Sequence, residues 1–226
     1  MHTAWYTGIL SVLFAILLTS FLINISFAQD TFTDPRDGHT YTIVMVGDQS
    51  WFGENLNYKT PTSWCAEVPE SEACTDGNFY YYTDLDSVCP SDWRVPHWED
   101  YRMAISFIGK IRKDSLVWTH GTMPNEDNEI EATTVEGLQL TDRSEPLQII
   151  ATGWIQGNKW FDQKNTTTLW IANKPPADKP QPHLHIREDA IVRHAHAHNI
   201  LDKPKRQRRF SVRCVSGTMP ANGYGN

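Results

Sequence analysis

Five histidines gather late in the chain, in two alternating runs. His183 and His185 form the first run, and the second consists of His194, His196 and His198. Because successive side chains of a β-strand point to opposite faces, each run lies on one face of its strand. Imidazole nitrogens are common ligands of Zn²⁺, Cu²⁺ and Ni²⁺, so three or four of them on one face could form a metal site. The alternative is a polar strand face that tolerates histidine without binding a metal.

The loop between the two histidine runs decides whether they meet. A two- or four-residue loop about Asp189-Ala190 would place both runs on one side of a β-ribbon. The cross-strand pairs would then be His185 with His194 and His183 with His196. A three- or five-residue loop would place the runs on opposite faces. The nearest carboxylates fall in the expected turn, so no acidic partner is evident that would orient the imidazoles.

Tryptophan offers a second candidate chemistry, since an exposed indole is a flat apolar surface on which a sugar ring can stack. Trp154 and Trp160 flank the turn signal Gly157-Asn158, which predicts a hairpin over residues 152–161. These two residues are therefore the candidate ligand-binding side chains. The alternative is that both of them pack in the core.

Calcium binding and catalysis are both disfavoured by the sequence. One type of calcium-dependent sugar site uses a Trp-Asn-Asp strand, whereas Trp170 is followed by Ile171-Ala172. Residues 125–129 carry oxygen ligands suited to Ca²⁺, but this stretch is also typical of an acidic solvated loop. The sequence contains no Gly-Xaa-Ser-Xaa-Gly, no His-Glu-Xaa-Xaa-His and no phosphate-binding loop motif. We therefore expect a non-enzymatic protein without a calcium site.

Charge narrows the range of partners. The formal net charge of −7 argues against a nucleic-acid-binding protein. One local exception is the basic cluster Lys203–Arg209. It is either a solvated hairpin tip or a site for acidic glycans or protein partners.

Four cysteines indicate disulfides if the chain is exported, and four cysteines allow three pairings. We expect Cys65–Cys74, which would close a short acidic loop, and Cys89–Cys214, which would join the last strand to the middle of the chain.

The N-terminus indicates export. An apolar stretch, Gly8–Ile25, precedes Ser26-Phe27-Ala28, which has small residues where a signal peptidase cleaves. We therefore expect a signal peptide over residues 1–28, a domain over 29–216 and a flexible tail over 217–226. Because no Lys or Arg precedes Arg36, a retained membrane anchor is the alternative.

The elements that must position these residues are mostly short strands. Strands are expected at 41–46, 49–52, 168–172, 183–186, 190–198 and 210–215, besides the hairpin at 152–161. Helical spacing of apolar residues predicts a helix over 97–111, and a shorter one is expected at 84–88. Residues 59–79 read as a loop, 113–150 as a long loop region with short strands, and 174–182 as a proline-rich linker. The fold class is therefore α+β, with few short helices, a small twisted antiparallel sheet and long, disulfide-tied loops.

Four segments, taken in order, resemble the Fibrobacter succinogenes major paralogous domain (FISUMP) family: residues 34–41, 49–58, 89–96 and 210–215. The resemblance implies an exported or surface protein of the kind found in Bacteroidetes and Fibrobacteres. It also implies a C-type lectin-like fold, in which a cysteine after the first helical region pairs with one in the final strand. That pairing supports Cys89–Cys214. The chain departs from the family pattern at 174–198, where prolines and histidines replace a stretch rich in glycine and tyrosine.

These observations lead to one main expectation and two alternatives. The main expectation is a secreted or cell-surface binding or assembly module that recognises a surface glycan or another surface protein. The first alternative is a metal-binding envelope protein that uses the histidine-rich hairpin at 183–198. The second is a structural subunit of a surface complex, anchored in the membrane by a retained N-terminal segment.

Overall fold

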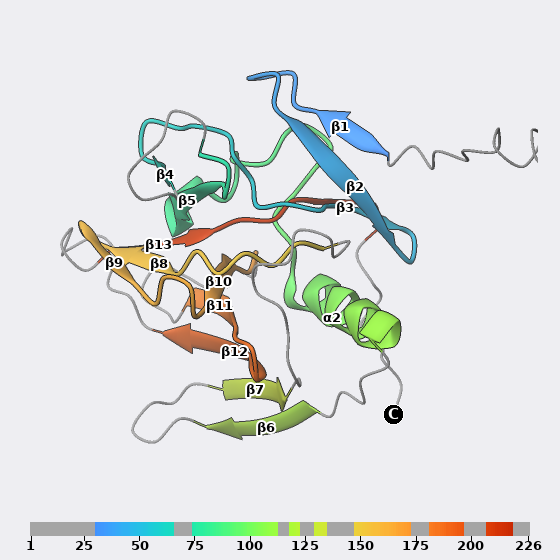
Figure 1. Cartoon of the computed structure of the whole chain (residues 1–226), viewed down its shortest axis with the longest axis vertical. Coiled ribbons are helices and arrows are strands. Elements are labelled where there is room, and N and C mark those ends of the chain that lie inside the picture. The colour runs from blue at the N-terminus through green and yellow to red at the C-terminus, as the bar shows by residue number, and fades with distance from the viewer. Residues whose placement is uncertain are drawn as a thin grey trace, which may run out of the picture.

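The computed structural model describes residues 30–65, 74–112, 118–122, 129–134, 147–172, 181–196 and 207–218. Two β-sheets and one α-helix make up this part of the chain (Figure 1). The first sheet has the order β1 (Thr31–Thr33), β2 (Thr40–Val46), β3 (Gln49–Phe52) and β14 (Val215–Ser216).

The second sheet is larger and forms the body of the molecule. Its main path runs through β4 (Trp64–Cys65), β5 (Asn78–Tyr81), β13 (Arg208–Ser211), β10 (Thr167–Trp170), β11 (Gln181–Ile186), β12 (Ala190–His196), β7 (Glu129–Thr134) and β6 (Trp118–Thr122). Two further strands, β8 (Trp154–Gln156) and β9 (Lys159–Phe161), extend beside β13. Neighbouring strands are antiparallel except β10 and β13, which are parallel.

The helix α2 (Trp98–Arg112) is fixed at its first turn by one carboxylate. Asp100 accepts hydrogen bonds from the backbone N–H of His97 (2.7 Å), from both terminal nitrogens of Arg94 (2.5 and 3.0 Å) and from Gln49 (2.6 Å). An acidic residue in this position satisfies an N–H group that the helix itself leaves unpaired. Burial by itself would raise the pKa of the Asp100 carboxyl, but these donors together lower the pKa below its usual value. The carboxylate therefore links α2 to β3.

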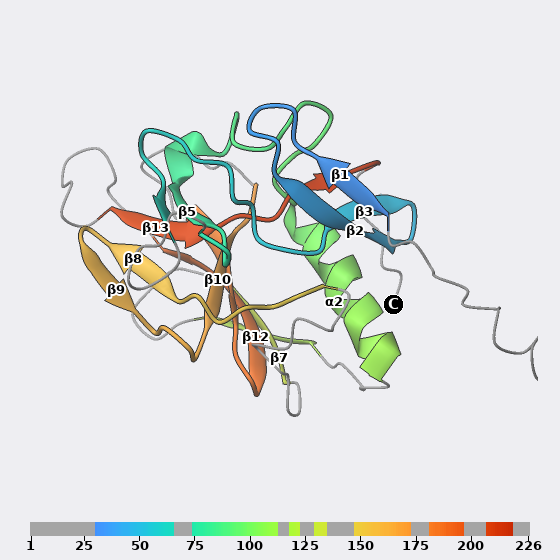
Figure 2. The same ribbon diagram turned by 45° about the horizontal axis from the view of Figure 1, so that its top comes forward.

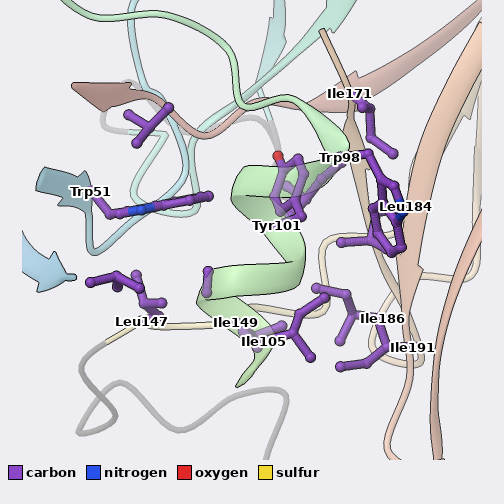
Figure 3. Packing of buried hydrophobic residues seen from close by; sticks show 14 of the residues in the cluster. Trp51, Trp98, Tyr101, Ile105, Leu147, Ile149, Ile171, Leu184, Ile186 and Ile191 are labelled. Carbon is purple, nitrogen blue, oxygen red and sulfur yellow. The ribbon is translucent and has the colours of Figure 1, made fainter. Parts of the chain in front are cut away.

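One face of α2 enters the main hydrophobic core. Trp98, Tyr101 and Ile105 recur at helical spacing and are buried. Figure 3 shows Trp51 of β3 on one side of the helix and the side chains of β11 and β12 on the other. The helix therefore packs both against the first sheet and against one face of the second (Figure 2).

The segment 208–216 joins the two sheets. It leaves β13 at Ser211 and enters β14 at Val215, crossing from one sheet to the other through Val212, Arg213 and Cys214. These three residues are buried. The Arg213 guanidinium donates to the carbonyls of Phe52 (3.1 Å), Gly53 and Gln148 and to the Asn55 side chain (3.2 Å).

Both expected disulfides are present. Cys65 and Cys74 lie 5.4 Å apart at their Cα atoms, and Cys89 and Cys214 lie 5.9 Å apart. Two disulfides are typical of a protein that folds in an oxidising compartment outside the cytoplasm. The described residues include no helix long and apolar enough to span a membrane.

The α+β class is confirmed, with corrections to individual elements. The expected single strand at 210–215 is two strands in different sheets, because the segment turns between them at Arg213 and Cys214. The sheets are larger than the small antiparallel sheet expected, and one pair of strands is parallel. No strand was expected at 78–81, yet β5 begins in the last two residues of the loop expected at 59–79 and continues past it, where Tyr80 pairs with the buried Phe210. The short helix expected at 84–88 is instead the 3₁₀ turn η1 (Tyr82–Asp84).

The expected irregular region and linker are described only in part. β6 and β7 lie within the stretch 113–150, and β11 begins at Gln181. The acidic stretch 125–128, residues 174–180 of the expected linker, the signal segment 1–28 and most of the expected tail lie outside the described residues. Within the expected tail, the carbonyl of Thr218 accepts a hydrogen bond of 2.9 Å from Gln49.

Candidate functional site

The β8–β9 hairpin projects at the end of the molecule away from α2 (Figure 1). Gln156 pairs with Lys159 across a two-residue loop, Gly157-Asn158. Gly157 has a φ of +59°, a left-handed conformation that glycine adopts without strain at the first central position of a tight hairpin turn. Gly153, which precedes β8, has a φ of +72°, and a Cβ atom there would lie 2.1 Å from the carbonyl oxygen of Phe161. The two glycines therefore define the ends of the hairpin.

One face of this hairpin carries an aromatic pair that we call the aromatic platform, Trp154 and Phe161. The two residues are paired across the strands, so their side chains share a face. Their rings are stacked with centroids 4.4 Å apart and planes 14° from parallel. The indole N–H of Trp154 donates to Asp162 (3.0 Å), and Phe161 is 37% exposed.

The aromatic platform is backed by a cation. Arg208 lies on β13, beside β8, and its guanidinium carbon is 4.7 Å from the centroid of the Trp154 ring. Since β8 lies between β13 and β9, Trp154 is enclosed between Arg208 on one side and Phe161 on the other. Phe161 is on the outer strand, and its ring is the part of this stack that is open to a ligand.

Trp160, the other expected ligand-binding tryptophan, lies on the opposite face of the hairpin. It pairs with the buried Ile155, and its ring meets Phe79 edge-on with centroids 5.5 Å apart. Its indole N–H donates to the carbonyl of Thr152 (2.7 Å). Trp160 therefore packs against the sheet and fixes the hairpin on it.

The structure corrects the pairing expected for the histidines. His183 pairs with His194, His185 with Val192, and Gln181 with His196. The loop is centred one residue earlier than expected, at Glu188-Asp189, with the Arg187 N–H donating to the Ala190 carbonyl (2.8 Å). Moving the loop centre by one residue moves each cross-strand partner by two residues, which keeps the partner on the same face. The strand positions of His183, His185 and His194 are therefore still on one face of the β11–β12 ribbon.

Two of the five histidine side chains can be described. The His183 ring is buried, with Nδ1 3.1 Å from the carbonyl oxygen of Gln181. Nδ1 of His185 lies 3.0 Å from the Thr168 hydroxyl, and the two imidazole centroids are 4.9 Å apart. The described residues contain no group of three metal-binding side chains. The side chains of His194 and His196, and all of His198, lie outside the described residues.

The aromatic platform and the histidines occupy the same face of the second sheet. The buried ring of Phe210 lies between them, 6.2 Å from Trp154 and 4.8 Å from His183, centroid to centroid. Two features that the sequence separates by about 20 residues thus lie on either side of the Phe210 ring, with strands β13 and β10 between β8 and β11.

A model of the Fibrobacter succinogenes major domain matches residues 44–216. The chain belongs to this family. Searches of curated proteins and of solved structures returned no match. The matched range of this Fibrobacter succinogenes major domain includes both disulfides, the aromatic platform and the β11–β12 ribbon that carries the histidines.

Phe161 is the site residue that the sequence analysis missed. The signal was present, because a hairpin turning at Gly157-Asn158 must pair Trp154 with Phe161 and Ile155 with Trp160. The apolar Ile155 marks the face that packs on the sheet. Trp154 and Phe161 must therefore be on the other face, and Trp160 on the inner one.

Proposed function

We propose that this Fibrobacter succinogenes major domain is an exported, non-enzymatic binding module that recognises a glycan at the bacterial cell surface. The observation that carries the proposal is the aromatic platform, where an exposed Phe161 ring is supported from behind by Trp154. The C-type lectin-like fold suggested by the family resemblance supports the same class of ligand. A surface protein is the other partner that such an exposed aromatic patch would suit.

The chemistry of the aromatic platform suits a sugar ring. Pyranose rings present a face of C–H groups that packs on a flat apolar surface, and an aromatic ring supplies a large surface at a small cost in side-chain entropy. Trp154 holds the Phe161 ring by stacking, and the bond from Trp154 to Asp162 in turn holds the indole. The platform is therefore ordered before the ligand arrives, which reduces the entropy lost on binding.

Replacing Phe161 by alanine is expected to weaken binding to the recognised polysaccharide about 10- to 100-fold. Burial of a phenylalanine side chain contributes about 1.5–3 kcal/mol, and each 1.4 kcal/mol is a factor of ten in affinity. The measurement is titration calorimetry of the oxidised protein against bacterial and algal polysaccharides, repeated with chelator present.

The matched control is Met45→Ala on β2, which truncates a side chain that is 50% exposed and far from the hairpin. Met45→Ala should bind as the unchanged protein does. Equal affinities of the Phe161→Ala and Met45→Ala proteins would exclude the aromatic platform as the binding site. A protein that binds no polysaccharide would leave a surface protein as the partner, to be identified by crosslinking on intact cells.

A second candidate function is metal binding at the β11–β12 ribbon, favoured by the register that pairs His183 with His194. When Nδ1 of His183 carries the proton, it donates to the Gln181 carbonyl, and the lone pair is on Nε2. Metal-binding histidines commonly have one ring N–H held by a backbone carbonyl in this way. The ligands would be imidazoles of His183 and of the second histidine run, and the ion would be Zn²⁺ or another divalent transition metal.

Metal binding predicts one bound ion per chain when the untagged protein is incubated with Zn²⁺, measured by native mass spectrometry and elemental analysis. His194→Gln should lose the ion because it removes the imidazole paired with His183. His39→Gln, in the β1–β2 hairpin, is the control and should keep it. Absence of bound metal in the unchanged protein would rule out this second function.

The third arrangement, a subunit held in a surface complex by a retained N-terminal segment, depends on residues outside the described range. It requires that residues 1–28 persist in the mature protein, which intact-mass measurement of the exported chain decides.

A further inference from the structure

The chain has a formal net charge of −7, yet among the described residues two cations lie beside the aromatic platform. Lys159 is on the same face of β9 as Phe161, because the two residues are two positions apart on one strand. Arg208 pairs with Gln156, which is on that face too. Against these two cations the hairpin contributes the carboxylate of Asp162, which accepts the indole N–H of Trp154.

The position of Arg208 is set by contacts between β13 and the hairpin tip. The Gly157 N–H donates to the Gln207 carbonyl (3.0 Å), and Arg209 donates to the Gly157 carbonyl (3.0 Å). Arg209 then lies over the Tyr81 ring, 4.0 Å from its centroid, on the other face of the sheet. Because neighbouring strand residues point to opposite faces, this contact directs Arg208 toward Trp154. Arg208 and Arg209, the last two residues of the basic cluster Lys203–Arg209, thus contact the hairpin that carries the platform.

We infer that the platform binds an anionic polysaccharide whose sugar rings carry carboxylates, that is, a uronate polymer. This inference rests on the proposed function and specifies its ligand. A sugar ring of the polymer would stack on Phe161 beside Lys159, while the carboxylate of another ring along the polymer would accept hydrogen bonds from Arg208, on the other side of Trp154. The planar guanidinium matches a carboxylate with two parallel N–H···O bonds, and Lys159 contributes a second positive charge.

The test compares two polymers that differ only at the carboxyl group, polygalacturonate and its fully methyl-esterified, uncharged form. Titration calorimetry of the oxidised protein should give at least tenfold tighter binding of polygalacturonate, and this preference should shrink as salt increases from about 50 mM to 500 mM because ions screen exposed charges. Arg208→Gln should weaken polygalacturonate binding about tenfold, as expected for one hydrogen-bonded charge pair. The same substitution should weaken binding of the methyl ester much less, because only the contact of Arg208 with Trp154 is then lost.

Arg102→Gln is the matched control, since it makes the same change of side chain on α2, which packs on the opposite face of the second sheet. It should leave the affinity for both polymers unchanged. Poly-glutamate and dextran sulfate serve as anionic polymers without uronate rings and should bind at least tenfold more weakly than polygalacturonate.

Each outcome bears on a different part of the inference. Equal binding of polygalacturonate and its methyl ester would overturn the preference for carboxylates while supporting glycan binding. Equal binding of poly-glutamate would overturn the uronate assignment, since charge alone would then suffice. Failure of the unchanged protein to bind any polysaccharide in the wider panel would overturn the proposed function itself, and with it this inference. If Arg102→Gln weakens polygalacturonate binding as much as Arg208→Gln does, the binding site is not at the platform.

Discussion

Removal of the Cys89–Cys214 disulfide by a double substitution with alanine is expected to lower the free energy of unfolding by about 5 kcal/mol. The bridge joins residues 125 positions apart, and constraint of a loop of that length in the unfolded chain accounts for this magnitude. Domains of this size are stable by about 5–15 kcal/mol, so the variant should be largely unfolded or close to it at 37 °C. The measurement is denaturant unfolding followed by tryptophan fluorescence.

The second disulfide provides the matched comparison. Cys65 and Cys74 are 9 positions apart, so their replacement by alanine should cost only about 2–3 kcal/mol. If the two double variants lose the same free energy of unfolding, loop length does not determine the effect, and the long bridge has no special role in closing the domain.

Replacing Arg213 by methionine is expected to lower the free energy of unfolding by about 3 kcal/mol or more, out of a total of about 5–15 kcal/mol. Methionine can fill the volume of the arginine stem, but it cannot donate to the three backbone carbonyls and the Asn55 oxygen that Arg213 binds. Each buried acceptor left without a donor costs about 1–3 kcal/mol. Burial lowers the pKa of Arg213 to about 10, so the guanidinium remains charged at neutral pH and its hydrogen bonds are charge-assisted.

Two further variants show whether the effect comes from the hydrogen bonds. Arg213→Lys should restore little stability, because an ammonium group cannot reach acceptors spread around a planar fork. Arg187→Met, at the exposed turn between β11 and β12, should change stability by no more than about 0.5 kcal/mol. An Arg213→Met protein as stable as Arg187→Met would show that the buried guanidinium contributes nothing net to the fold. Chemical denaturation gives all three values.

The elements that the sequence predicted correctly are those with a complete local signal. The β2–β3 hairpin turns at Gly47-Asp48, and α2 has apolar residues at helical spacing after Pro96. The hairpin of β8 and β9 follows from Gly157-Asn158. In each case the turn or the period lies within about 15 residues, so no distant contact is needed to define the element.

The elements that were missed depend on partners far away in sequence. Residues 210–215 look like one continuous strand, and the break occurs where Arg213 and Cys214 meet Asn55, Gln148 and Cys89. β5 is similar, because its strand conformation comes from pairing with β13, which lies more than 100 residues later. No local pattern encodes such contacts, so propensity alone assigns these residues incorrectly.

The candidate site was predictable in part. The hairpin and Trp154 followed from the sequence, whereas Arg208 came to the platform only through the pairing of β13 with β8. For the histidines, the shared face was one of the arrangements considered, but the loop was placed one residue too late. Such a shift changes every cross-strand partner and leaves the face unaltered, because side chains alternate with a period of two.

The position of β13 in the second sheet has a consequence for the timing of folding. β13 pairs with β5, β8 and β10, and the chain that supplies it continues directly into β14 of the other sheet. These strands are among the last of the matched domain to be synthesised, at about 5–20 residues per second. Until residues 208–216 leave the ribosome, neither sheet can be completed. The complete native structure can therefore form only when synthesis of the domain is nearly finished.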